Sequence, residues 1–191
     1  VVLSGGGAKG VAHISALKVI EEAGIPIDYV VGTSMGSLIG ALYSIGYTTT
    51  QIDSLVRCQD WKFLFTDASS NENESLNKRE KSGQYVLTVP FHKSPTDLLT
   101  GGGVIQGRNI ASLFSKLTGE YHDSIDFNKL PIPFACVAYD ISKGKEYVFH
   151  SGRLSLAMRS SMSIPGVFNP VKWNNMVLVD GGLSDNYPVD V

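Results

Sequence analysis

Two short glycine-rich motifs in the N-terminal part of the chain contain residues that could do chemistry. SGGGAKG runs from Ser4 to Gly10 after a short apolar segment, and GTSMG runs from Gly32 to Gly36. A loop of the first kind presents bare backbone N–H groups to an anion. A G-x-S-x-G motif between a strand and a helix is typical of a nucleophile elbow, a tight turn that exposes a strained serine, here Ser34. The two motifs therefore indicate either the binding of a nucleotide's phosphate or the stabilisation of a reacting carbonyl's oxygen.

The first motif also satisfies G-x-G-x-x-G, the pattern of dinucleotide-binding loops, over residues 5–10. Such a site needs an acidic residue at the end of the second strand to bind a ribose, but Asp28 begins that strand and Ser34 follows it. A P-loop needs Lys and then Ser or Thr after the last glycine, where this chain has Val11 and Ala12. A nucleotide-binding module is therefore the less favoured alternative.

A nucleophilic serine needs a base. The histidines are His13, His92, His122 and His150. The first lies one turn after the glycine loop, which indicates a structural or capping role, and the others have the polar surroundings of surface residues. Asp180 stands at the end of an apolar run, in LVDGGLSDNYP. Because Asp-Gly is also a strong hairpin-turn signal, the local pattern leaves open whether Asp180 is a catalytic base or a turn residue.

The composition limits the class of protein. With 191 residues, 43% of them hydrophobic, the chain can build one sizeable core, so we expect a single domain over residues 1–191. A net charge of -2 gives no general attraction to nucleic acid or to an anionic membrane, so any membrane contact would be local and peripheral. Cys58 and Cys136 are far apart and predict buried thiols rather than a disulfide or zinc site. No apolar run reaches the ~18 residues that cross a bilayer, and no signal peptide is evident.

The chain starts inside a strand pattern at Val1 and ends at NYPVDV without a helix. We therefore expect a segment of a longer polypeptide, truncated at its C-terminus. The oligomeric state is left open, and so is the choice between cytoplasm and cell envelope.

The hydrophobic periodicity predicts strands that alternate with helices. Strands are expected at 1–3, 28–32, 85–89, 132–141, 145–151 and 175–182, and helices at 11–23, 38–46, 48–57 with Thr50 as its cap, 108–118 and 155–164. The polar stretch 67–82 and the glycines 101–103 predict loops. This order favours an α/β fold with a mostly parallel sheet. In such a sheet the glycine loop and Ser34 emerge at one edge, as an oxyanion hole and its nucleophile do.

Four motifs in order carry a resemblance. SGGGAKG, GTSMG, SSMSIPGVFNPV and DGGLSDNYP fill nearly the whole chain and resemble the patatin-like phospholipase family, in particular its bacterial members. The resemblance implies a three-layer α/β/α fold and a Ser-Asp dyad. It makes Ser34 the nucleophile and Asp180 the base. The implied oxyanion hole consists of the backbone amides of Gly5, Gly6, Gly7 and Ala8. The supporting motif residues are Lys9, Gly10, Gly32, Gly36, Gly181, Gly182, Asn186 and Pro188.

The resemblance also implies roles for the supporting residues and a substrate. Asn186 and Pro188 would hold the loop after the base, and Lys9 would shape the glycine loop or meet a lipid phosphate. The substrate would be a lipid or lysophospholipid ester, with no metal, cofactor or nucleic acid involved. Region 67–103 would border the site and set substrate choice. The bacterial envelope is the favoured location on this ground alone.

The implied mechanism makes a physical demand. An aspartate with an ordinary pKa near ~3.9 is a poor base toward a serine, so burial should raise the pKa of Asp180, and its carboxylate should contact Ser34 directly. Ser34 would attack an ester carbonyl and water would release the acyl-enzyme. In the alternative, an acyltransferase, an alcohol or thiol takes the place of water, and a histidine near Ser34 would favour it. A scaffold without activity is disfavoured because both dyad residues are present.

Overall fold

The computed structural model describes residues 1–67 and 105–191. The strand predicted at 85–89, most of the polar stretch 67–82, the loop at 101–103 and His92 lie outside the described residues.

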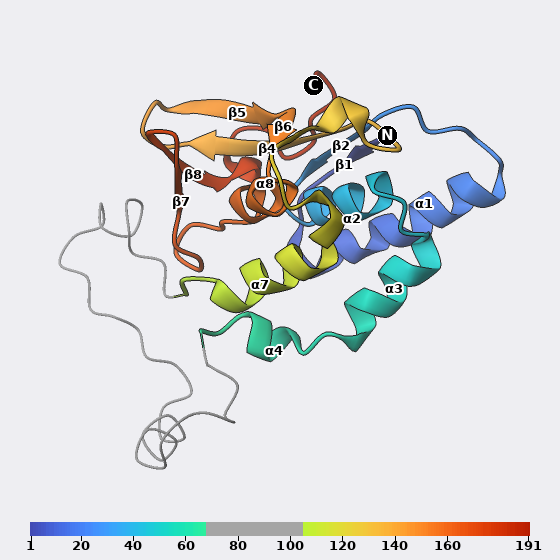
Figure 1. Ribbon diagram of the computed structural model, residues 1–191, viewed down its shortest axis with the longest axis horizontal. Helices are drawn as coiled ribbons and strands as arrows, with labels where there is room; N and C mark the ends of the chain where they lie inside the picture. Colours follow the sequence, from blue (N-terminus) through green and yellow to red (C-terminus); the bar gives the residue numbers. More distant parts are fainter. Residues whose placement is uncertain (68–104) are drawn as a thin grey trace, which may run out of the picture.

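A mixed sheet of six strands forms the centre of the molecule (Figure 1). Its strands are β1 (Val2–Leu3), β2 (Val30–Thr33), β4 (Phe134–Asp140), β5 (Lys145–Phe149), β7 (Val171–Trp173) and β8 (Met176–Asp180). β1, β2 and β4 are parallel to one another, as predicted, because helical segments connect them. β5, β7 and β8 join antiparallel, so the prediction of a mostly parallel sheet holds only for this N-terminal part. β4 and β5 are joined by a hairpin, as are β7 and β8, and such short connections require antiparallel neighbours.

The hairpin between β7 and β8 was not predicted. β7 has three residues, and Asn174 and Asn175 connect it to β8 with φ values of 45° and 59°. Two consecutive residues with positive φ are what a type I′ hairpin turn requires. This turn, and not the Asp-Gly pair at 180–181, is the turn of the hairpin.

The strands β2 and β8 lie along the same edge of β4, end to end. β5 occupies the other edge, opposite residues 136–140. β2 runs parallel to β4 and ends with Thr33 opposite Val137, whereas β8 runs antiparallel and ends with Asp180 opposite Ala138. The carboxyl ends of the two strands therefore meet at consecutive residues of β4.

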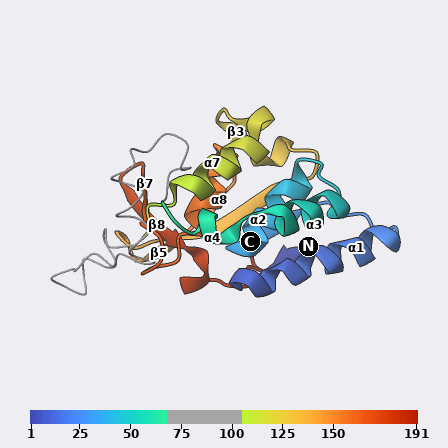
Figure 2. The ribbon, with the colours of Figure 1, turned by 90° about the horizontal axis from the view of Figure 1, so that it is seen from below.

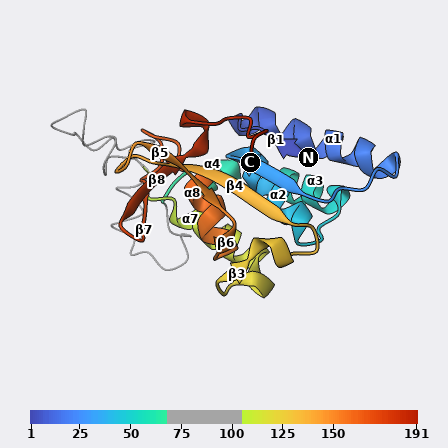
Figure 3. The same cartoon turned by 90° about the horizontal axis from the view of Figure 1, so that it is seen from above.

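Helices pack on the face of the sheet to which Phe134 points. They are η1 (Gly7–Val11), α1 (Ala12–Glu22), α2 (Met35–Ser44), α3 (Thr49–Cys58), α4 (Trp61–Leu64), α7 (Arg108–Leu117) and α8 (Leu154–Ser161). The shorter elements are η3 (Gly119–Tyr121), η4 (Phe127–Lys129), η5 (Gly181–Leu183) and the pair β3 (Ile125–Asp126) and β6 (Ser151–Gly152). From below, α2, α3 and α7 lie in front of β4 (Figure 2), and from above β2 and β4 lie in front of α2 (Figure 3). The predicted α/β fold, a central sheet with helices packed on it, is confirmed. Because these helices lie on one face, the described residues do not show the helical layer on the opposite face that a three-layer α/β/α arrangement implies (Figure 2 and Figure 3).

The core is formed where α2 and α8 meet the sheet. α2 is buried nearly all round because the sheet covers one side of it and α1 and α3 cover the other. Gly40 allows its close approach, since a Cβ there would lie 2.9 Å from a methyl group of Val30. Cys136 is buried as predicted, but Cys58 is exposed. The buried positions of α3 include Ile52 and Val56, so a residue two positions further on points to the solvent.

The cap of α3 differs from the prediction by two residues. Thr48, and not Thr50, caps the helix: its hydroxyl accepts from the backbone N–H of Gln51 at 3.2 Å. The side-chain oxygen of Gln51 in turn accepts from the backbone N–H of Thr48 at 2.8 Å. This reciprocal capping box needs Gln or Glu three residues after the cap, a spacing that Thr48 alone has within the threonine run.

Within residues 1–67 and 105–191, no helix has the length and hydrophobicity to span a membrane.

Candidate active site

Ser34 occupies a strained turn between β2 and α2. Its backbone angles are φ 53° and ψ -120°, a region that residues other than glycine rarely adopt. Such strain is what the nucleophile-elbow pattern predicts. The side chain is 4% exposed and lies at the N-terminus of α2, where the helix dipole favours a developing negative charge.

The glycines two positions before and after Ser34 are required by close backbone contacts. A Cβ on Gly32 would lie 2.5 Å from the carbonyl oxygen of Gly36. A Cβ on Gly36 would collide with the backbone carbonyl of Leu3 in β1. The spacing of GTSMG therefore allows β1, β2 and α2 to come together around the serine.

Asp180 contacts Ser34 directly. The Ser34 hydroxyl donates to Asp180 Oδ2 at 2.7 Å, and the Gly182 backbone N–H donates to Asp180 Oδ1 at 2.8 Å. The carboxylate is 7% exposed. Burial raises the pKa of Asp180 above its ordinary value, while the hydrogen bonds from Ser34 and Gly182 lower it by less. The carboxylate is therefore a stronger base than an exposed aspartate, as expected from the sequence.

A serine that sequence reasoning did not single out completes the elbow. The parallel ladder between β2 and β4 includes the hydrogen bond from Val30 N–H to the Pro133 carbonyl, and two further steps of two residues would join Ser34 N–H to the Val137 carbonyl. Instead the hydroxyl of Ser161 stands between these groups. It accepts from Ser34 N–H at 2.9 Å and donates to the Val137 carbonyl at 2.6 Å. The end of β2 is thereby held away from β4 while its backbone groups stay paired.

Ser163, two residues further on, is hydrogen-bonded to Asp180. Its carbonyl accepts from the backbone N–H of Asp180 at 2.9 Å. Ser160, Ser161 and Ser163 are all fully buried. The signal in the sequence was this group of serines at the end of an apolar helix, because buried hydroxyls must find partners.

The glycine loop presents free backbone amides beside Ser34. Lys9 is the first residue of the loop to donate within it, to the Gly6 carbonyl at 3.1 Å. The N–H groups of Gly6, Gly7 and Ala8 precede it and have no acceptor inside η1, as at any helix start. η1 continues directly into α1, so the positive end of the helix dipole lies at this loop. Gly5 differs, because its N–H donates to the Asn186 carbonyl at 3.2 Å.

The segment after Asp180 is joined to both N-terminal motifs. Its Asn186 lies against the glycine loop, where a Cβ on Gly5 would come within 2.5 Å of Asn186 Oδ1. The Thr33 hydroxyl, next to Ser34, donates to the Asp185 carbonyl at 3.0 Å. Gly181 packs on the backbone of β4, and Pro188 is buried. The loop-holding role implied for Asn186 and Pro188 stays a prediction.

Two further motif residues face different surroundings. Gly10 packs against Met35, since a Cβ there would lie 2.7 Å from that side chain, whereas Lys9 is exposed on η1.

The described histidines have partners other than Ser34. His13 Nε2 lies 2.9 Å from the Ser4 carbonyl and so holds the start of the glycine loop, as its predicted structural role requires. His122 Nδ1 lies 2.9 Å from the Gly119 carbonyl. His150 Nδ1 lies 3.4 Å from the Tyr29 hydroxyl.

Two cavities open at Ser34. One has a volume of about 290 Å³ and is lined by Gly7, Ala8, Val11, Ser34, Met35, Trp61, Phe65, Met162, Ile164 and Phe168. The other has a volume of about 250 Å³ and is lined by Gly6, Gly7, Ser34, Ile164, Pro165, Asp180, Gly182, Leu183 and Asn186. The first is almost entirely apolar, whereas the second contains the carboxylate and an amide side chain. Ile164 borders both cavities, so Ser34 lies where an apolar and a polar compartment meet.

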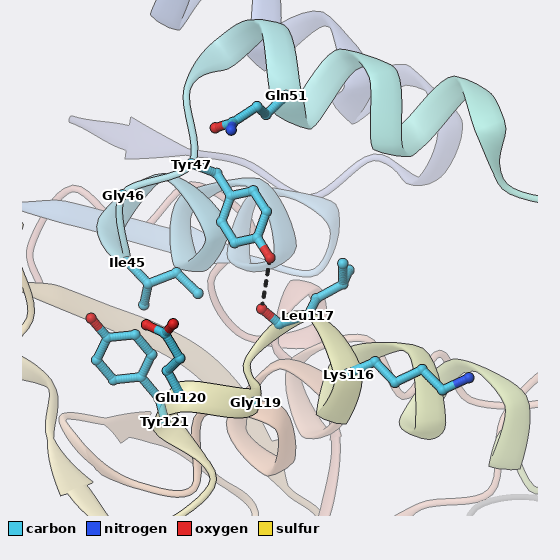
Figure 4. A pocket seen from close by; sticks show the side chains of 9 residues that line it. All are labelled: Ile45, Gly46, Tyr47, Gln51, Lys116, Leu117, Gly119, Glu120 and Tyr121. Carbon is cyan, nitrogen blue, oxygen red and sulfur yellow. Dashed lines mark hydrogen bonds between the residues drawn. The ribbon is translucent and has the colours of Figure 1, made fainter.

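A separate cavity of about 410 Å³ lies at the other end of α2 (Figure 4). The Tyr47 hydroxyl crosses it to donate to the Leu117 carbonyl at 3.0 Å. Glu120 and Tyr121 line the same space. α2 has ten residues, a length of about 15 Å, so this cavity is too far from Ser34 to hold the reacting group.

Comparisons with known proteins agree with this arrangement. The chain is 30% identical over 190 residues to an NTE family protein of Mycobacterium tuberculosis, covering 100% of this chain and 27% of that protein. It is 31% identical over 192 residues to human patatin-like phospholipase domain-containing protein 6, covering 100% of this chain and 12% of that protein. The chain thus spans about a quarter or less of the length of these relatives.

A solved structure shares the fold of this chain, and a family model matches its sequence. The crystal structure of VipD from Legionella pneumophila matches with a TM-score of 0.60 at 17% identity, over 97% of this chain and 46% of VipD, which shows a common fold. The family model described as patatin-like phospholipase matches residues 1–191. With Ser34 on its elbow, Asp180 against it and the glycine loop beside both, the chain belongs to the patatin-like phospholipase family.

Proposed function

We propose that this domain is a serine lipid acyl hydrolase that cleaves carboxylic esters of phospholipids or lysophospholipids. Ser34 is the nucleophile and Asp180 the base of a two-residue dyad. The observation that carries the proposal is the 2.7 Å hydrogen bond from the Ser34 hydroxyl to a buried carboxylate. Family membership and the apolar cavity at Ser34 support a lipid ester as the substrate.

The reaction runs in two halves. Asp180 takes the proton of the Ser34 hydroxyl as Oγ attacks the ester carbonyl. The tetrahedral intermediate then collapses, and the leaving alcohol takes that proton from Asp180. A water molecule, deprotonated by Asp180, attacks the acyl-enzyme, and the fatty acid leaves as Ser34 recovers its proton. The raised pKa of Asp180 suits this work, because a general base is most effective when its pKa approaches the working pH.

The oxyanion is held by backbone amides of the glycine loop. We assign this role to Gly6, Gly7 and Ala8, whose N–H groups have no acceptor inside η1. Gly5 serves the loop in another way, because its N–H is used by Asn186. Removing one such donor typically costs 10²–10³ in rate, which sets the scale of the expected contribution.

The competing functions have less support. An acyltransferase related to the carrier-protein transacylases would place a histidine at Ser34, and the described histidines contact other groups. A nucleotide site would need an acidic ribose ligand after β2, where Ser34 stands.

Labelling with a fluorophosphonate tests the nucleophile. The probe should label the wild type and fail to label Ser34→Ala. Asp180→Asn should react about 10²–10⁴-fold more slowly, the usual contribution of a general base. Ser15→Ala, which alters an exposed serine of α1, is the matched control and should label like the wild type. Full labelling of Ser34→Ala, or none of the wild type, would show that the assignment is wrong.

A further inference from the structure

The apolar cavity at Ser34 has one wall made of aromatic rings in contact with one another. The ring centroids of Trp61 and Phe65 are 5.9 Å apart, and those of Phe65 and Phe168 are 5.5 Å apart. The indole N–H of Trp61 donates to the Val56 carbonyl at 2.9 Å. Because its single polar atom is already paired with α3, the indole offers only hydrocarbon surface to the cavity.

A buried arginine fixes the far part of this wall. The guanidinium of Arg159 lies 4.8 Å from the ring centre of Phe168. It donates to Ser163 Oγ at 2.6 Å and to the carbonyls of Gln106 and Asn169 at 3.0 and 3.3 Å. Burial lowers the pKa of Arg159 to about 10, so the group is still cationic at neutral pH. Phe168 is therefore held between a positioned cation on one face and the cavity.

The two compartments at Ser34 differ in what they can do for the two halves of an ester. The leaving alcohol must take its proton from Asp180, and Asp180 lines the polar cavity but not the apolar one. The alcohol portion therefore belongs in the polar cavity, with Gly182 and Asn186. The acyl carbons continue from the other side of the carbonyl, where the apolar cavity begins at Gly7, Ala8 and Ser34.

We propose that the apolar cavity binds the acyl chain and that Trp61 and Phe65 contact the chain and limit its length. This inference rests on the proposed function, because it takes Ser34 and Asp180 as the reacting groups. The ligand is a hydrocarbon acyl chain, since none of the lining side chains within residues 1–67 and 105–191 is charged and could pair with a polar chain.

A series of p-nitrophenyl esters from four to sixteen carbons tests the chain-length limit. Each methylene that enters the cavity should raise kcat/KM about fourfold until the space is filled, after which the gain should stop. Trp61→Ala should move the optimum to chains about two to four carbons longer, because an indole occupies the space of several methylenes. Trp173→Ala is the matched control. That indole packs on Tyr147 and Phe149 at the sheet, so its loss should leave the chain-length profile unchanged.

A binding measurement keeps the test independent of turnover and of misfolding. The chain has two tryptophans, so Trp173→Phe leaves Trp61 as the only indole. In a Ser34→Ala background, a fatty acid brominated along its chain should quench Trp61 fluorescence, whereas in the reciprocal Trp61→Phe protein it should not quench Trp173. Equal quenching of both indoles, or of neither, would overturn the acyl-site assignment even if the fluorophosphonate labels Ser34. Failure of that labelling would instead overturn the proposed function.

Discussion

Ser161→Ala should lower the stability of the protein and the labelling rate of Ser34 more than a substitution of the neighbouring Ser160. The hydroxyl of Ser161 pairs Ser34 N–H with the Val137 carbonyl, and both groups lie in the fully buried junction between β2 and β4. Removing the hydroxyl strands a donor and an acceptor at once. A buried unpaired polar group costs about 1–3 kcal/mol, so two of them cost about 2–6 kcal/mol before any relaxation. We expect a loss near 3 kcal/mol in the free energy of unfolding.

Ser160 provides the matched control. It is as fully buried as Ser161, but its hydroxyl donates only to the Leu156 carbonyl one turn back in α8, at 2.8 Å. That carbonyl is also an acceptor in the helix ladder, so Ser160→Ala leaves no acceptor unpaired and should cost less than about 1 kcal/mol.

Urea unfolding and fluorophosphonate labelling measure the two variants. With a typical slope of about 1–3 kcal/mol per molar urea, Ser161→Ala should lower the midpoint by about 1–3 M. Its labelling rate should fall about tenfold, because the strained turn at Ser34 loses the group that holds it. Ser160→Ala should stay within twofold of the wild type in labelling. Equal effects of the two substitutions on both measurements would refute the argument that Ser161 bridges the ladder.

Three further predictions concern separate parts of the molecule. The acid limb of kcat/KM should have its midpoint above the ordinary aspartate pKa of ~3.9, because burial raises the pKa of Asp180. Because the pKa of Asp180 is raised in the folded state, the stability contributed by its protonated form is present at low pH and lost as pH rises through that pKa. Asn does not titrate, so the urea midpoint of Asp180→Asn should rise relative to that of the wild type between the ordinary and the raised pKa. Gly36→Ala should lower the free energy of unfolding by about 3 kcal/mol or more, because its Cβ meets a backbone carbonyl that cannot move away. Gly119→Ala, with open space around its Cβ, should leave the stability nearly unchanged. Thermal unfolding of the two variants measures the difference. Thr48→Ala should cost about 0.5–2 kcal/mol and Thr50→Ala much less, since only the first is a helix cap; equal losses in urea unfolding would contradict the capping box.

The parts of the site that the sequence predicted are local in the chain. The strand, tight turn and helix around Ser34 lie within fifteen residues, and the glycines that the turn needs belong to the same motif. The right-handed rule for parallel strands then places the loop after β1 and the loop after β2 at one edge. Periodicity also located β4, β8 and α8, because a buried strand and an amphipathic helix each leave a pattern in the sequence that encodes them.

Distant pairings decided the rest. Asp180 reaches Ser34 from 146 positions away because β8 lies antiparallel on the same edge of β4 as β2, beyond the end of β2, and no periodicity encodes which edge a strand joins. The same packing pairs the Gly5 N–H with the Asn186 carbonyl and places the Ser161 hydroxyl between β2 and β4. It also brought Trp61 to the apolar cavity. Thus the sequence by itself determined the elbow, the free amides of a helix start and the acidic candidate. Only the tertiary structure decided that the carboxylate reaches the serine, because a backbone hydrogen bond between strands carries no record of its partner in the local residue pattern.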